Sequence, residues 1–168
     1  LESAGLRRWN TRTWKKDLPL SGLKTALGFA RGGRVIVGVE QDHLSLWHTE
    51  NCSKIGQLSG TVSLLDRAGV ALVVSPVVAS PDGETVFLGD RGEIRSWDIE
   101  GRIELAPMRY LAGESTHCLA MSRDGILAGA HGNGRVTLWD IATRQLLHVF
   151  EAHMAWVSTV AFSPDGSL

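Results

Sequence analysis

The chain has 168 residues, 43% of them hydrophobic and 21% charged, a balance that is typical of a soluble globular protein and excludes a disordered or fibrous one. Seventeen Lys and Arg residues stand against eighteen Asp and Glu, and the formal net charge of −1 argues against nucleic acid or a membrane as a partner. Cys52 and Cys118 lie outside any Cys/His ligand spacing, which argues against a disulfide scaffold or a metal site and favours a reducing, cytoplasmic compartment.

A turn signal recurs along the chain. The sequence Ser-x-Asp-Gly occurs three times after a degenerate first copy, and the final glycines are Gly33, Gly83, Gly125 and Gly166. A tryptophan follows each of the first three glycines after fourteen residues, at Trp47, Trp97 and Trp139. Constant spacing of this kind is the signature of a repeat protein.

Each repeat predicts four antiparallel strands. An apolar, β-branched run before the turn, such as 73–79, predicts a buried inner strand, and a second run at 85–88 follows the turn. The alternating stretch 93–97 predicts a strand with one buried face, and a less regular fourth strand is expected at positions such as 146–150. The inner-strand pattern returns at 157–162.

The motifs of these repeats resemble those of the WD-repeat family. They comprise two Trp-Asp dipeptides, two degenerate copies and an Ala-His where the family has Gly-His: Trp97-Asp98, Trp139-Asp140, Trp47-His48, Trp9-Asn10 and Ala152-His153. The resemblance implies an all-β fold, a β-propeller segment of four-stranded antiparallel blades that is incomplete and therefore open.

The resemblance also divides the chain into repeats. It implies the outer strands of a partial blade, three WD-type repeats and a truncated repeat with an inner strand, at 1–22, 23–60, 61–112, 113–152 and 153–168. Family propellers close with more blades than this, commonly seven. We therefore expect a fragment whose partners include the remaining blades of a longer propeller.

The second repeat carries an insertion near 60–72. In the family, this connection lies on the face most used for partners, so the insertion is a candidate for presenting Asp66 and Arg67 there. Its apolar residues, Val62 among them, favour slightly the alternative that the insertion extends a strand and is buried.

A hydrogen-bond network is expected around the repeat tryptophans. In the family, a His before the inner strand and an Asp in the second turn complete it, and His153 matches the first position. Asn133 and Arg91 stand where the carboxylate would be, so the resemblance implies an incomplete network in these blades. We expect the other histidines to be ordinary surface residues: His43, His48, His117, His131 and His148.

Catalytic motifs are absent from the sequence, and no cofactor is implied. Gly132-Asn133-Gly134 begins like a phosphate loop, but Asn-Gly between two strands predicts a hairpin turn, and no helix follows. Asp98 and Asp140 repeat with the fold, so we interpret them as structural residues.

Trp156 stands apart from the repeat tryptophans. It precedes an inner strand beside Met154, at a place that resembles the family's partner-facing rim, and a large aromatic beside a methionine is typical of a binding hot spot. Ser115 and Glu114 occupy the corresponding place one repeat earlier. Packing of Trp156 on a neighbouring blade is an equally open alternative.

These patterns favour a non-catalytic scaffold that binds proteins or peptides through one rim. The alternative is that the chain is the sensor or substrate-docking region of a larger multidomain enzyme, such as a signalling kinase or protease.

We predict that the isolated 168-residue chain self-associates, because its first and last blades expose faces and edges that neighbours would cover. Size-exclusion chromatography with light scattering measures this directly. A compact, stable monomer at all concentrations would contradict the prediction.

Overall fold

The computed structural model describes residues 9, 12–15, 23, 25–62, 77–90, 92–110 and 114–166. Within this part of the chain the fold is built from β-strands and a single 3-10 turn, η1 (Arg31–Gly33). The expected all-β class is confirmed.

The strands form three antiparallel sheets. The first contains β1 (Thr25–Ala30), β2 (Val35–Glu40), β3 (His43–His48) and β4 (Lys54–Gln57). The second contains β5 (Val77–Ala79), β6 (Thr85–Gly89), β7 (Glu93–Asp98), β8 (Ile103–Glu104) and β9 (Met108–Arg109). The third contains β10 (Thr116–Met121), β11 (Ile126–His131), β12 (Arg135–Asp140) and β13 (Gln145–Glu151).

The fourth position of the second sheet is divided between two short strands. β8 pairs with the end of β7 and β9 pairs with its beginning. Pro107 lies between them, and because proline lacks an N–H it cannot continue a ladder of backbone hydrogen bonds. Together the two strands take the place that β4 and β13 hold in the other sheets.

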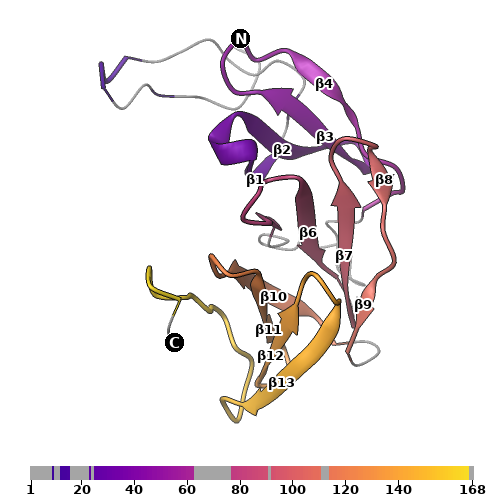
Figure 1. The fold of residues 1–168 in the computed structure, drawn as a ribbon, viewed down its shortest axis with the longest axis vertical. Helices are drawn as coiled ribbons and strands as arrows, with labels where there is room; N and C mark the ends of the chain where they lie inside the picture. The colour runs from indigo at the N-terminus through magenta and orange to yellow at the C-terminus, as the bar shows by residue number, and fades with distance from the viewer. Residues whose placement is uncertain are drawn as a thin grey trace.

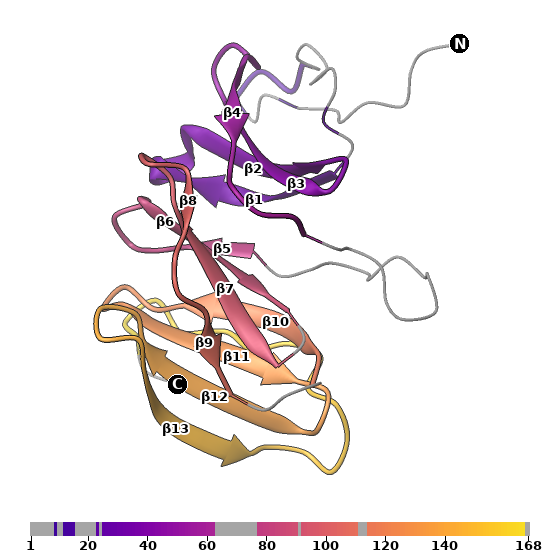
Figure 2. The ribbon, with the colours of Figure 1, turned by 90° about the vertical axis from the view of Figure 1, so that its right-hand side faces the viewer.

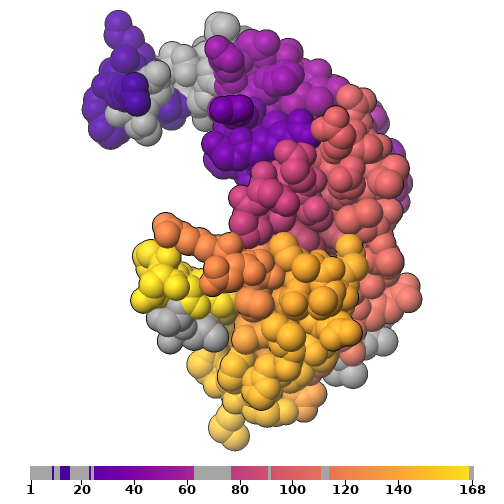
Figure 3. All heavy atoms as spheres, viewed as in Figure 1, coloured from indigo at the N-terminus to yellow at the C-terminus, as the bar shows by residue number. Residues whose placement is uncertain are grey.

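The three sheets follow one another along an arc, as the blades of a propeller do. The sheets stack face to face (Figure 2), with inner strands such as β1 and β10 toward the concave side of the arc and outer strands such as β8 toward its convex side (Figure 1). The surface is a crescent (Figure 3). The predicted open propeller of four-stranded antiparallel blades is therefore confirmed.

The Ser-x-Asp-Gly turn is held by its own side chains. In the turn between β5 and β6, the hydroxyl of Ser80 donates to Asp82 at 2.5 Å and accepts the backbone N–H of Thr85 at 2.9 Å. Asp82 also accepts the N–H of Glu84. Gly83 has φ 77°, a left-handed conformation that other residues adopt at a cost, which explains the glycine of the motif.

The core lies between the sheets and not within one of them. Val86 of β6 packs with Val37 of the first sheet, whereas its neighbour Phe87 points the other way and packs with Leu127 of the third sheet. The side chains of Val86, Phe87 and Leu127 are each at most 2% exposed. Each blade is thus apolar on both faces and needs a neighbour on each.

The truncated repeat differs from the expectation of an inner strand. Residues 157–162 form no β-ladder with any described residue. In every complete blade the inner strand pairs with the strand that follows it in sequence. Val157 is nonetheless 4% exposed, packs on Ala130 and Val136, and donates its N–H to the carbonyl of His131.

Two arginines join neighbouring blades at the turn between the third and fourth strands. Arg144 of the third blade donates to the Ser96 hydroxyl and the Ala106 carbonyl of the second blade, each at 2.5 Å. Arg102, at the same turn of the second blade, lies against Gly56 of the first blade. Burial lowers the pKa of Arg144, since its environment supplies hydrogen-bond acceptors but no carboxylate.

We predict that Arg144→Ala destabilises the chain by about 1–3 kcal/mol, because the substitution leaves buried Ser96 and the Ala106 carbonyl without their donor. Urea unfolding of the full chain measures the loss as a lower midpoint. Arg123→Ala, which removes an exposed arginine from a turn of the same blade, is the control and should leave the midpoint unchanged. Equal midpoints for both variants would show that the contact contributes nothing.

Candidate interaction rim

The blades present two rims. One rim, which we call the connection rim, is formed where the second strand turns into the third and where one blade leads to the next. Its described segments are 41–42, 58–62, 90, 92, 110, 114–115, 132–134 and 152–156. The opposite rim, the turn rim, carries the Ser-x-Asp-Gly turns and the turns that follow the repeat tryptophans.

Trp156 and Met154 lie on the connection rim and are exposed to solvent. Trp156 is 66% exposed and Met154 is completely so. The indole of Trp156 meets the imidazole of His117 edge to face, with ring centroids 5.5 Å apart and an interplanar angle of 90°. The structure thus presents a large aromatic surface at the end of the third blade.

Glu114 and Ser115 lie beside this surface and are fixed by their backbones. The Glu114 carbonyl accepts the N–H of Gly92, and the Ser115 carbonyl accepts the N–H of Gly132, at 2.6 and 2.9 Å. A Cβ placed on Gly132 would lie 3.2 Å from His117 Nε2 and 3.8 Å from a carboxylate oxygen of Glu114. Glu114 and His117 therefore converge on the space that this glycine leaves.

The other two rim candidates, Asp66 and Arg67, lie outside the described residues. Val62, at the start of the insertion, is 3% exposed and donates its N–H to the Asp42 carbonyl. The insertion therefore begins from a buried anchor on the connection rim.

His131 was expected at the surface, and the structure corrects this. Its side chain is 3% exposed, because it ends strand β11 on the side that faces the neighbouring blade. His131 Nε2 lies 2.8 Å from the Thr137 hydroxyl, which also accepts the indole N–H of Trp139 at 3.0 Å. Nδ1 lies 3.3 Å from the Thr116 hydroxyl, and Thr116 donates to the Asp90 carbonyl of the second blade.

This network replaces the one expected from the family pattern. His153 is exposed, and its backbone N–H, at 2.9 Å, donates to the Gly134 carbonyl. Asn133 accepts the N–H of Arg135 and so holds the hairpin turn, while Arg91 lies outside the described residues. A histidine at the end of an apolar strand, next to an Asn-Gly turn, was the signal in the sequence that could have located the network.

Known proteins share these repeats. Residues 144–168 match the family model described as "WD domain, G-beta repeat". The chain is 28% identical over 130 residues to WD repeat-containing protein 36 of Homo sapiens, covering 69% of this chain and 14% of that protein. It is 32% identical over 91 residues to the meiotic recombination protein rec14 of Schizosaccharomyces pombe, covering 53% of this chain and 30% of that protein.

A solved structure shares the fold. A chain in a crystal structure of the mitotic checkpoint complex superposes with a TM-score of 0.67 at 20% identity, over 89% of this chain and 46% of that one. The family match at 144–168 and these relatives support a WD-repeat family for the chain. It spans less than a third of the length of the two curated relatives and about half of the superposed propeller chain.

The Trp and Asp residues of the WD dipeptides have structural roles within and between the blades. Trp97 is fully buried and donates to the Ser59 carbonyl of the preceding blade at 2.7 Å. Asp98 accepts the N–H of Gly101, and Asp140 accepts two N–H groups of its turn. Trp47 is buried too, and its Nε1 finds no hydrogen-bond partner in the described part of the chain.

The turn glycines of the WD repeats all take the left-handed conformation. Gly83, Gly125 and Gly166 have φ of 77°, 82° and 83°. Gly134 also has positive φ and closes the hairpin between β11 and β12, which is the predicted structure for this segment.

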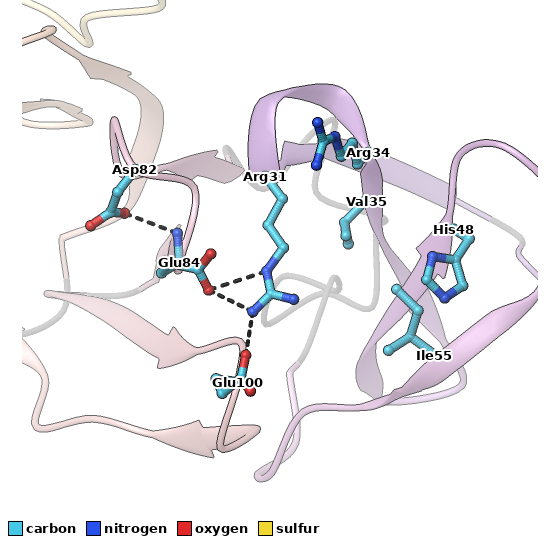
Figure 4. Close-up of a pocket in the computed structure, with 8 residues that line it drawn as sticks. All are labelled: Arg31, Arg34, Val35, His48, Ile55, Asp82, Glu84 and Glu100. Atoms are coloured by element: carbon cyan, nitrogen blue, oxygen red, sulfur yellow. Dashed lines mark hydrogen bonds and ion pairs between the residues drawn. The ribbon is translucent and has the colours of Figure 1, made fainter.

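The turn rim carries a cavity of about 590 Å³ between the first and second blades (Figure 4). Arg31 crosses it and binds Glu84 at 2.6 Å and Glu100 at 2.7 Å. Because both carboxylates are used by this arginine, the cavity is best explained as the solvent-filled surround of a link between blades.

Two further features are absent from the described residues. They contain no group of three or more His, Cys, Asp or Glu side chains placed to bind a metal. They also contain no helix long and apolar enough to cross a membrane.

We predict that His131 makes the WD-repeat chain less stable in weak acid. Burial, with a smaller contribution from His117, lowers the pKa of His131 from 6.5 to about 4. The unfolded chain therefore binds a proton as the pH falls below 6.5 while the folded chain does not, so the stability present above pH 6.5 is lost toward pH 4, by about 2 kcal/mol at pH 5.

Urea midpoints of the full chain at pH 7 and pH 5 measure this loss. His131→Gln removes the titration and should reduce the difference between the two pH values, although it also weakens the network at pH 7. His148→Gln, at an exposed position on β13, is the matched control. A pH dependence that is the same in His131→Gln and the wild type would contradict the assignment.

Proposed function

We propose that this chain is a protein-interaction platform that binds proteins or peptides through its connection rim, without making or breaking a covalent bond. The observation that carries the proposal is the exposed indole of Trp156 beside Met154. Tryptophan is prominent among the residues that dominate binding energy, because it buries a large area at low entropic cost. Ser115, Glu114 and the insertion with Asp66 and Arg67 complete the proposed surface.

The fold supports a scaffold rather than a catalyst. Asp98, Asp140 and the repeat tryptophans are engaged in turns and blade contacts, and Arg31 occupies both carboxylates at the turn-rim cavity. A rigid platform that uses its loops for recognition is consistent with this distribution. Its two cysteines are unpaired, which supports a cytoplasmic setting.

The alternative, a docking or sensor region of a larger multidomain enzyme, has one observation in its favour. WD repeat-containing protein 36 is so much longer than this chain that the match covers 14% of it. Kinase or hydrolase motifs in the gene on either side of residues 1–168 would favour this alternative.

We predict that Trp156→Ala weakens partner binding by roughly 30-fold, the change expected from removing a hot spot of about 2 kcal/mol. The measurement is quantitative capture of cellular proteins by the tagged full-length protein, followed by titration of each recovered partner. Trp14→Ala is the control, since Trp14 is 77% exposed and lies in the chain before the first complete blade.

Arg67→Ala tests the contribution of the insertion in the same experiment. Partners whose affinity is unchanged in both Trp156→Ala and Arg67→Ala would overturn the assignment of this rim.

A further inference from the structure

Two described cations at the connection-rim end of the blades are already paired with carboxylates. Arg109 binds Glu93 at 3.2 Å and Arg135 binds Glu151 at 2.7 Å. Lys54 binds Glu40. These positive charges are neutralised within the chain, so they offer little to an acidic partner.

Glu114 differs from these carboxylates. Among the described residues, no hydrogen bond or ion pair is formed by its carboxylate, and its side chain is only partly buried. Its backbone is held in place by Gly92, so the carboxylate is presented from a fixed position. The charge left for a partner at this point of the rim is therefore negative.

At two other places in this chain, a cationic side chain lies between a tryptophan ring and a carboxylate. The guanidinium of Arg95 lies 4.9 Å from the ring centre of Trp97 while it binds Glu104 at 2.6 Å. The ammonium of Lys54 lies 6.0 Å from the ring centre of Trp47 while it binds Glu40. In both cases a cation is shared between an aromatic face and a carboxylate.

An aromatic and a carboxylate lie near a common residue once more: Trp156 contacts His117, and Glu114 approaches Gly132 together with His117. Among the described residues, no cation lies over the Trp156 ring. His117 connects them: its ring supports the Trp156 indole at 5.5 Å, and its Nε2 and the Glu114 carboxylate converge at Gly132. One residue of the pair is an exposed aromatic and the other an unpaired anion.

We propose that this cluster, Trp156, His117 and Glu114, binds a lysine or arginine side chain of a protein partner. The cation forms an ion pair with Glu114 and lies against the indole of Trp156, as Arg95 does with Glu104 and Trp97. This proposal rests on the proposed function and adds to it the chemistry of the partner: a basic segment rather than an acidic or purely apolar one.

The test uses the full-length protein with ¹⁵N-labelled tryptophan and four tripeptide probes. The probes are acetyl-Gly-X-Gly-amide with arginine, lysine, citrulline or glutamate as X, because citrulline keeps the shape of arginine without its charge. The Trp156 indole signal, assigned by its loss in Trp156→Phe, reports binding. We expect the arginine and lysine probes to shift this signal in a saturable, salt-sensitive manner, and the citrulline and glutamate probes not to.

Glu114→Gln should weaken binding of the two cationic probes by up to about fivefold, the upper end of the range for an exposed ion pair. Asp42→Asn, which removes an exposed carboxylate from the same rim of the first blade, is the matched control and should leave binding unchanged. Unchanged indole signals of Trp47, Trp97 and Trp139 establish that each variant is folded.

Equal shifts with arginine and citrulline, or equal affinity in the wild type and Glu114→Gln, would overturn this inference. The proposed function would survive that result if Trp156→Ala still weakened binding of captured partners. If Glu114→Gln left probe binding unchanged and Trp156→Ala left partner binding unchanged, both the inference and the proposed function would be rejected.

Discussion

The packing of one sheet on the next is the constraint on which the rest of the structure depends. Adjacent residues of a central strand, such as Val86 and Phe87, point into two different interfaces, so a blade has no face that can be left to solvent. Burial of apolar surface drives this stacking, and polar contacts such as Arg144 to Ser96 fix the order of the blades. The result is a stack that confines variable chemistry to its two rims.

The rims differ because the chain uses its charges differently on them. At the turn rim, Arg31 joins two blades through two carboxylates. At the connection rim, Arg109 and Arg135 are likewise paired with carboxylates, whereas Glu114 has no such partner and lies near His117, which contacts the exposed Trp156. A surface that combines an unpaired anion with an exposed aromatic is suited to recognition, which is why the proposed function and its further refinement both depend on this corner.

The interior of the third blade shows how a repeat tolerates a departure from its family pattern. The position of the expected carboxylate is taken by Asn133, which serves the hairpin, while His131, Thr137 and Thr116 satisfy the indole of Trp139 in another way. A buried indole N–H requires an acceptor, but the fold does not dictate which side chain supplies it. The neutral histidine that results gives this blade its predicted sensitivity to acid.

The sequence by itself determined the class of fold, the four-stranded repeat and the turn glycines, because each follows from local periodicity or backbone conformation, as Gly83 and Trp97 illustrate. It also identified Trp156 as a candidate without deciding between exposure and packing. Only the tertiary structure buried His131, left residues 157–162 without a ladder, brought Glu114 and His117 together at Gly132 and placed Trp156 against His117. The physical reason is that these outcomes depend on which strands and blades become neighbours, and such contacts join residues whose separation in sequence carries no periodic signal.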